Sequence, residues 1–224
     1  SDVCSSDLNG IKYIKQDGSV GYYQTVNKTT PVAGDVKYVD RNGDGVVDDN
    51  DRDIIGNPNP DFTYGFQTKV SWKSLSLSAS FNGVQGRDIL NVGNRYNNTP
   101  GTKSNNVTRK AFQNMWTDEN PSNLYPKSTF VVQNMVMDRY VEDGSYLRCS
   151  DITLSYILPA KWTNKIGIKN TSVYASVKNA FVITDYSGYD PEVNSFAFDG
   201  LRPGVDMNSY PTPRSFVFGL NLTF

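Results

Sequence analysis

The chain has 224 residues, enough for one large domain or two small ones, and its 22 basic and 23 acidic side chains give a net charge of −1. This balance argues against nucleic-acid binding, because neutralising phosphates normally requires a basic excess. Histidine is absent, which excludes a Ser-His or Cys-His hydrolase within this chain and removes the commonest zinc ligand. With no nucleophile motif either, we do not expect an enzyme.

Aromatic residues are frequent for a chain that is polar on average. The sequence has 14 Tyr and 11 Phe, while hydrophobic residues make up 38% of it. Strands with one wet and one apolar face produce this composition. The sequence contains no run of about 18 apolar residues, so it predicts no membrane-spanning helix. This does not argue against a membrane barrel, because the strands of a barrel never produce such a run.

The first forty residues carry weak signals. Residues 1–8 show neither a strand pattern nor a secretory leader, and we expect a non-native or unrelated leader without a part in the fold. Residues 11–14 and 19–25 flank a Gln-Asp-Gly triplet at 16–18, which predicts a hairpin because glycine tolerates positive φ. Residues 34–40 predict a short strand.

An acidic loop follows, reading DRNGDGVVDDND over residues 40–51. It matches the twelve-residue calcium loop, with Gly45 at the sixth position, where the chain must turn sharply. Oxygen-only ligands suit Ca²⁺. No flanking helices are evident, so a structural calcium clip is expected rather than a sensor, and the alternative is an acidic turn solvated by water. The predicted metal ligands are Asp40, Asn42, Asp44, Val46 (through its carbonyl), Asp48 and Asp51.

Residues 61–72 and 75–82 alternate between apolar and polar side chains, the period-two pattern of a strand with one apolar face. Lys73 and Ser74 separate them. Strands of about ten residues joined by so short a turn match tilted membrane strands. The apolar faces comprise Phe62, Tyr64, Phe66, Val70 and Trp72 on the first strand and Leu75, Leu77, Ala79 and Phe81 on the second.

Residues 83–145 lack this order, and only a helix at 107–116 is predicted there, with Val107, Ala111, Phe112, Met115 and Trp116 on one side. Alternation returns at 146–158 and 172–183, on either side of a shorter connection. A second long polar segment covers 184–213. The last eleven residues alternate again and place Phe216, Phe218, Leu220, Leu222 and Phe224 on one face.

Long and short connections alternate along the chain, as in an up-and-down barrel with long extracellular loops and short periplasmic turns. We therefore predict an all-β fold, the C-terminal portion of a large transmembrane β-barrel with about five antiparallel strands and long extracellular loops. Residues 9–60 would be an extracellular loop region. Residues 61–224 would be barrel strands with long loops at 83–145 and 184–213.

The chain resembles the C-terminal end of SusC/RagA-family TonB-dependent outer-membrane transporters. The resemblance implies a barrel of about 22 strands with an N-terminal plug in the cell outer membrane, of which this chain supplies about five wall strands. Five strands leave two open edges, so this chain alone is not expected to transport. The segments that carry the resemblance are residues 34–66 (GDVKYVDRNGDGVVDDNDRDIIGNPNPDFTYGF), 81–91 (FNGVQGRDILN), 146–156 (YLRCSDITLSY) and 210–224 (YPTPRSFVFGLNLTF).

The resemblance also implies partners. It implies import of oligosaccharide or peptide fragments, with a SusD-like lipoprotein covering the barrel and TonB energising it through a missing N-terminal part. Outer-membrane lipid would contact the apolar faces. The last strand, from Phe216 to Phe224, would be the signal for the barrel-assembly machinery, because an exposed edge can dock by strand addition. The plainer alternative is a last wall strand with interfacial aromatics.

The second long segment contains Tyr186, Tyr189, Phe196 and Phe198, which could stack on sugar rings, although packing within the loop is favoured. Its acidic residues show no glycosidase-like pair. The alternative function is a secreted, calcium-stabilised carbohydrate-binding β-sandwich. A sandwich would bury the apolar face of each strand against a second sheet.

Overall fold

The structure is a computed structural model in which the chain divides into two compact units. The first contains Ser1–Gly56 and Leu90–Val141, and the second contains Asn57–Ile89 and Glu142–Phe224. The described residues are 2–3, 12–14, 20–22, 33–44, 48–99, 106–128, 136–163, 168, 170–192 and 194–223.

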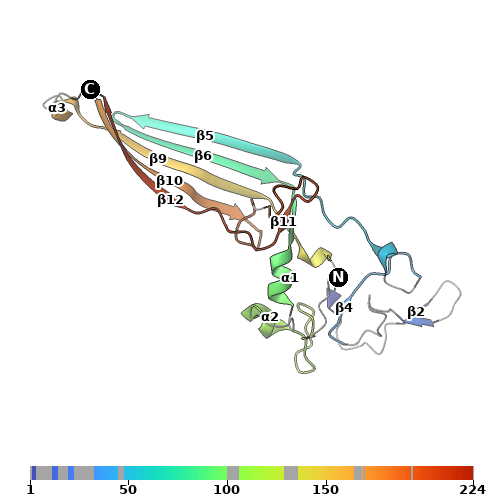
Figure 1. Ribbon diagram of the computed structural model, residues 1–224. Helices are drawn as coiled ribbons and strands as arrows, with labels where there is room; N and C mark the ends of the chain where they lie inside the picture. The colour runs from blue at the N-terminus through green and yellow to red at the C-terminus, as the bar shows by residue number, and fades with distance from the viewer. Residues whose placement is uncertain are drawn as a thin grey trace. The chain divides into compact units, whose positions relative to one another are not determined.

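A five-stranded antiparallel sheet, called here the large sheet, dominates the second unit (Figure 1). Its neighbouring strands are joined in the order in which they occur along the chain, which confirms the predicted up-and-down arrangement. The sheet is open, with β5 and β12 as its two edges among the described residues. The strands are β5 (Phe62–Trp72), β6 (Leu75–Gln85), β9 (Tyr146–Ile157), β10 (Asn170–Thr184) and β12 (Ser215–Thr223).

The connections of the large sheet are sorted by length between its two ends. At one end, residues 73–74 join β5 to β6, with Lys73 at φ 53°, and residues 158–169 join β9 to β10. The second connection includes the short helix α3 (Ala160–Thr163). Both long connections, residues 86–145 and 185–214, leave from the opposite end. This sorting is the predicted barrel topology.

One face of the large sheet is apolar across all five strands. The strand register places Val70, Leu77, Leu154, Ala175 and Phe218 in a single row across the sheet. The four large side chains of this row are exposed, with Phe218 78% and Val70 63% exposed. The described residues therefore do not cover this face with a second sheet, as a sandwich would. A face of this kind is the one that a barrel turns toward lipid.

The opposite face is polar and rich in hydroxyl groups. Asp151 on β9 accepts hydrogen bonds from the hydroxyls of Thr153 and Ser176, each at 2.8 Å, and pairs with the Lys178 ammonium at 2.6 Å. The serines opposite one another on β5 and β6, Ser71 and Ser76, join their hydroxyls at 2.9 Å. Such a face suits the watery interior of a barrel.

A β-bulge interrupts β9 at Ser150. Strand β6 pairs Ser80 with Asp151 but the next residue, Phe81, with Cys149, so Ser150 has no opposite residue on β6. The Ser150 hydroxyl donates to the Ser80 carbonyl at 3.1 Å. A bulge of one residue exchanges the two faces of the strand beyond it.

This exchange of faces decides on which side of the sheet Arg148, the only cation of β9, lies. In unbroken alternation Arg148 would share the apolar face with Ile152 and Leu154, where a charge facing lipid is costly. Beyond the bulge, Arg148 pairs with Asn82 and Val182 on the polar face. The alternation predicted for residues 151–158 is correct but does not continue to the start of the strand.

In the first unit, short strands pair near the beginning of the chain. Strand β2 (Lys12–Ile14) pairs with β3 (Val20–Tyr22), which confirms the predicted hairpin. Strand β1 (Asp2–Val3) pairs with β4 (Val36–Lys37). The opening eight residues, expected to hold no strand, therefore contribute a two-residue one.

A small core lies in the same unit. Val36, Met137 and Tyr140 are buried together, with Tyr38 and Leu90 packed against them. Burial, and next the nearby Tyr140, raise the pKa of Tyr38 to about 12. The unit also contains η1 (Asp49–Asp51), α1 (Val92–Asn98), α2 (Arg109–Asn114) and η2 (Asp138–Tyr140).

Helix α2 is shorter than the predicted helix at 107–116. The Thr108 side chain caps it by accepting from the Ala111 amide at 3.2 Å. Ala111 and Trp116 are buried, as expected for one apolar side, but Phe112 is exposed. Among the described residues, no helix has the length and apolar character needed to span a membrane.

A small sheet has the strand order β11 (Val205–Asp206), β7 (Asp88–Asn91) and β8 (Val141–Asp143). The periodicity of the sequence did not predict these strands, each of which has only two to four residues. Strand β11 belongs to the long connection between β10 and β12.

Two glycines of the large sheet lie beneath tyrosine rings. Tyr174 stands directly opposite Gly219, and Tyr64 directly opposite Gly83. In each pair the ring occupies the space that a Cβ on the glycine would need. These pairs favour the observed register, because a slip of one residue would bring each ring against a side chain.

We expect Gly219→Val to lower the free energy of unfolding by about 1–3 kcal/mol, because the new side chain collides with the Tyr174 ring. Denaturant unfolding of the whole protein in detergent measures this. Gly200→Val is the matched control, since a Cβ added there meets no atom within 4 Å. Equal stability of the two variants would contradict the packing argument.

Candidate functional site

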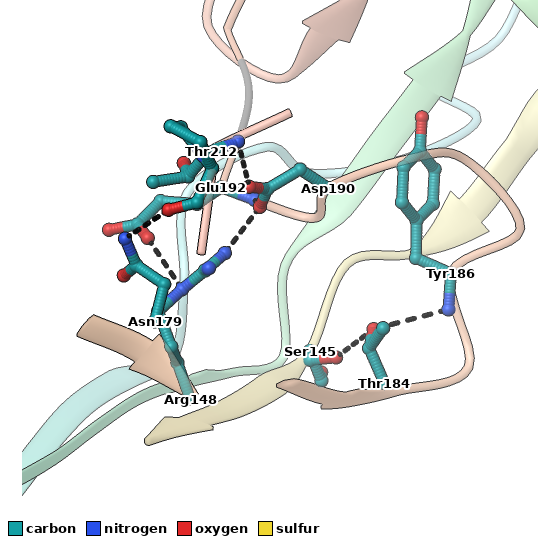
Figure 2. A network of polar contacts seen from close by, with 9 residues as sticks. Ser145, Arg148, Asn179, Thr184, Tyr186, Asp190, Glu192 and Thr212 are labelled. Atoms are coloured by element: carbon teal, nitrogen blue, oxygen red, sulfur yellow. Dashed lines mark hydrogen bonds and ion pairs between the residues drawn. The ribbon is translucent and has the colours of Figure 1, made fainter. Parts of the chain in front are cut away.

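The most buried polar contact of the large sheet joins Arg148 on β9 to Asp190 (Figure 2). Asp190 lies in residues 185–213 of the connection between β10 and β12, called here the connection 185–213. The Arg148 Nη2 lies 2.5 Å from the Asp190 Oδ1, and the two side chains are only 6% and 3% exposed. A buried ion pair of this kind needs further hydrogen bonds to offset the cost of removing two charges from water.

Asp190 satisfies its other lone pairs with backbone amides of the same connection. Its Oδ1 accepts from the Glu192 amide at 2.9 Å, and its Oδ2 accepts from the Thr212 amide at 3.0 Å. Residues 190 and 212 lie near the two ends of the connection. One carboxylate therefore closes the base of the connection and fastens it to β9.

Glu192 adds a weaker contact to Arg148. Its Oε2 lies 3.0 Å from the Arg148 Nε, but this N–H group is not aligned for a hydrogen bond. Glu192 is half exposed, so water screens the attraction. The Arg148 guanidinium also lies 5.8 Å from the centre of the Tyr146 ring, within the range of a cation–π contact.

Opposing effects act on the pKa of Asp190. Burial would raise it, but the hydrogen bonds from the Glu192 and Thr212 backbone and the charge of Arg148 hold the pKa below the ordinary value of 3.8. The carboxylate therefore stays charged at neutral pH and keeps all three partners.

Further contacts hold the same connection. The buried Tyr186 hydroxyl donates to the Asp206 Oδ2 at 2.7 Å, and burial and then Asp206 raise the pKa of Tyr186. Ser187 donates through its amide and its hydroxyl to Glu142, at 2.8 and 2.9 Å. The Thr184 hydroxyl, at the end of β10, accepts from the Tyr186 amide at 3.2 Å and donates to the Ser145 carbonyl at 2.8 Å (Figure 2).

The four aromatic residues proposed as ligand contacts fall into two groups. Tyr186 is buried as an anchor, and Phe196 is half-buried beneath the Arg202 guanidinium, 5.2 Å from its ring centre. Tyr189 and Phe198 are 73% and 88% exposed. Of the four proposed contacts, these two are therefore the rings that a ligand could reach.

The described residues of the acidic loop, 40–44 and 48–51, form hydrogen bonds with one another. The Asp40 Oδ1 accepts from the Gly43 amide at 2.7 Å, and the Asn42 Oδ1 from the Asp44 amide at 2.9 Å. Asp51 accepts from the amides of Arg41 and Asp48, both at 2.8 Å. Although its slight burial would raise the pKa of Asp51, these backbone hydrogen bonds lower it.

Five of the six predicted calcium ligands lie in the described residues, and Val46 lies outside them. The described carboxylates do not form a group of three or more that could hold a metal ion. The Asp51 carboxylate faces backbone amides instead. Calcium binding at this loop remains a prediction.

The predicted assembly signal lies on the edge strand β12. Phe216, Phe218, Leu220 and Leu222 share the apolar face and are exposed, while Phe224 lies outside the described residues. The partner of β12 in the large sheet is β10, so its other edge is open in the described structure. An open edge with aromatic side chains suits strand addition.

Sequence reasoning missed the Arg148–Asp190 pair. Asp190 was only one of several scattered acids, and its partner lies 42 residues away in the chain. A signal was nevertheless present, because Arg148 occupies an even-numbered position in a strand whose apolar residues, Ile152, Leu154 and Tyr156, are also even-numbered. A cation on the apolar face predicts a bulge or a partner.

The lowered pKa of Asp190 predicts how the connection responds to acid. A carboxylate with a depressed folded-state pKa stabilises the fold above its ordinary pKa, and this contribution is lost as pH falls through the folded value. Hydrogen-exchange protection of the Glu192 and Thr212 amides, corrected for intrinsic rates, should stay constant from pH 7 to about 4 and decline below. The Ala79 amide in β6 should not follow this decline. Loss of protection near pH 6 would contradict the assignment.

A scan against protein-family models found no match, but individual proteins are similar. The chain is 35% identical over 201 residues to TonB-dependent receptor P26 of Formosa agariphila, covering 86% of this chain and 20% of that protein. It is 34% identical over 194 residues to TonB-dependent receptor SusC of Bacteroides thetaiotaomicron, covering 84% and 17%. The chain thus spans about a fifth of these relatives.

Solved structures agree with the sequence relatives. The structure of the RagAB peptide transporter matches with a TM-score of 0.63 and 29% identity, over 74% of this chain and 17% of that one. The RagAB peptide importer in its "open-open" state matches in fold with a TM-score of 0.65 and 24% identity, over 96% of this chain and 22% of that one. The chain therefore belongs to the SusC/RagA family of TonB-dependent receptors, outer-membrane β-barrel proteins, and forms one part of such a barrel.

Proposed function

We propose that this chain is part of an importer that carries glycan or peptide fragments across the outer membrane, and that it forms barrel wall and extracellular loops. The observation that carries the proposal is the large sheet, with an exposed apolar face on one side and a hydroxyl-rich face on the other. Its similarity to SusC and to the RagAB peptide transporter supports the same function.

The chain would act only within the whole barrel. The edges of β5 and β12 are both open among the described strands, and an open sheet encloses no pore. We propose that the remaining strands and a plug close the barrel, that a SusD-like lipoprotein covers it, and that TonB energises it through a part outside this chain. None of these roles requires catalysis by this chain.

Tyr189 and Phe198 are the proposed ligand contacts. Their exposed rings lie on a connection that several buried contacts hold in place. An aromatic ring held in this way can stack on a sugar ring or on an apolar peptide side chain at little entropic cost. Both substrate classes therefore remain in the proposal.

Import should be measured with the whole receptor in a strain that lacks its own copy, using oligosaccharides and short peptides as separate panels. We expect one panel to be imported, and Tyr189→Ala with Phe198→Ala to weaken uptake by about tenfold, as expected for lost aromatic contacts. Leu201→Ala is the control, because Leu201 is equally exposed in the same connection. Import of neither panel would contradict the proposed function.

We also propose that the loop from Asp40 to Asp51 binds calcium as a structural clip. Its ligand spacing supports this, as does the tight turn that Asp40 and Asn42 already form. Because Asp51 faces backbone amides in this structure, binding would require its carboxylate to turn.

Calcium at about 100 times its dissociation constant should stabilise the whole receptor by about 2.7 kcal/mol, and chelation should remove the effect. Asp44→Asn should weaken the effect. Asp53→Asn should not, because Asp53 lies outside the twelve positions and pairs with Arg41. Thermal unfolding with and without calcium measures both, and an unchanged midpoint would leave only a solvated acidic turn.

A further inference from the structure

The connection 185–213 is held by two separate strands, β9 of the large sheet and β8 of the small sheet. Near the two ends of the connection, the Thr212 amide donates to the Asp190 carboxylate, which in turn accepts from Arg148 of β9. Ser187 is held by Glu142, the middle residue of β8, with both its amide and its hydroxyl engaged. The connection is therefore held by side-chain contacts as well as by its covalent links to β10 and β12.

Within the connection, a second set of contacts joins its two arms. The Ser195 hydroxyl lies 2.6 Å from the Ser209 hydroxyl and accepts from the Met207 amide at 2.8 Å. The Ser195 amide donates to the Val205 carbonyl at 2.9 Å. These contacts make the connection a folded element instead of a flexible loop.

The central contact resists opening for an energetic reason. Lifting the connection would separate Arg148 from Asp190 and break a charge-assisted hydrogen bond that water hardly screens, because both side chains are almost closed to water. Exposed pairs, such as Arg202 with Asp199, can separate at little cost. A moving gate is ordinarily built from contacts of the second kind.

The bulge at Ser150 is an independent observation on the same residue. Without it, Arg148 would face away from the connection, on the apolar side of the sheet. The local distortion of β9 therefore delivers a single cation to the point where the connection is fastened. A bulge that re-aims one side chain is a recurrent device near functional sites.

We propose that residues 185–213 form a strap that stays docked on the polar face of the large sheet throughout import, with Arg148 as its positioning residue. Substrate passes beside the strap, and the strap presents Tyr189 and Phe198 in a fixed position. The proposal rests on the import function proposed above, and it assigns Arg148 no contact with substrate.

The decisive experiment tethers the strap, in the whole receptor, to β8, the strand that Gly144 and Ser145 connect to β9 of the large sheet. The side chains of Glu142 and Ser187 are in contact. After Cys4 and Cys149 are replaced by alanine, Glu142→Cys and Ser187→Cys are joined by a short thiol-reactive cross-linker whose spacer contains a reducible disulfide. The tethered receptor should import its substrate panel at the rate of the same receptor before cross-linking. Import that stops on tethering and returns on reduction would show a gate and overturn the strap.

A second experiment tests Arg148 itself. Arg148→Met should speed hydrogen exchange of the Glu192 and Thr212 amides by about tenfold, because Asp190 loses its fixed position, and should reduce import. Arg202→Met, which removes the exposed cation of the same strap, should change neither. Adding the Glu142–Ser187 tether to Arg148→Met should restore import.

The outcomes separate the two proposals. If Arg148→Met loses protection throughout the large sheet, or if the tether does not restore its import, Arg148 supports the fold and is not a positioning residue. If the unaltered receptor imports neither panel, the import function fails. The amide exchange still tests the docking of the strap, because it does not depend on transport.

Discussion

The pairing of every backbone amide in the large sheet with a neighbouring strand is the constraint on which the rest of this structure depends. Lipid offers no hydrogen bonds, so a strand that faces it must satisfy its N–H and C=O groups along both edges. Pairing fixes the register, and the register decides which side chains form each row. The row from Val70 to Phe218 and the polar cluster around Asp151 are two results of the same register. The open edges of β5 and β12 show where the described strands leave that constraint unfulfilled.

The bulge at Ser150 shows how a charge is admitted without breaking this order. Strand β9 keeps its pairing with both neighbours, yet Arg148 reaches the polar face because one residue is left over. Asp190 then compensates the charge in a site that water hardly enters. The cost of burying two charges is offset only because Asp190 also accepts two backbone amides. The ion pair therefore depends on the bulge, and the bulge depends on the register of the strands.

Much of the large sheet could be predicted from local sequence, because period-two alternation is a local signal. The strands at Phe62–Trp72, Leu75–Gln85 and Ser215–Thr223 follow directly from it. Strands β7, β8 and β11 could not be predicted, because two to four residues carry no periodicity. The Arg148–Asp190 pair required knowledge of which distant segment folds over β9. The acidic loop showed its residue pattern in the sequence, but not that Asp51 turns to backbone amides.

The closure of the connection at Asp190 also bears on how such a protein can vary. Because Asp190 binds the Thr212 amide, the residues between them form a ring whose base has a constant width. Lengthening the ring changes its closure entropy only slowly, by about 0.6 kcal/mol for each doubling. Insertions at its tip, around Phe198, are therefore not transmitted to the strands beneath. The tip of the connection can therefore vary in length and sequence while the strands of the large sheet keep the same register.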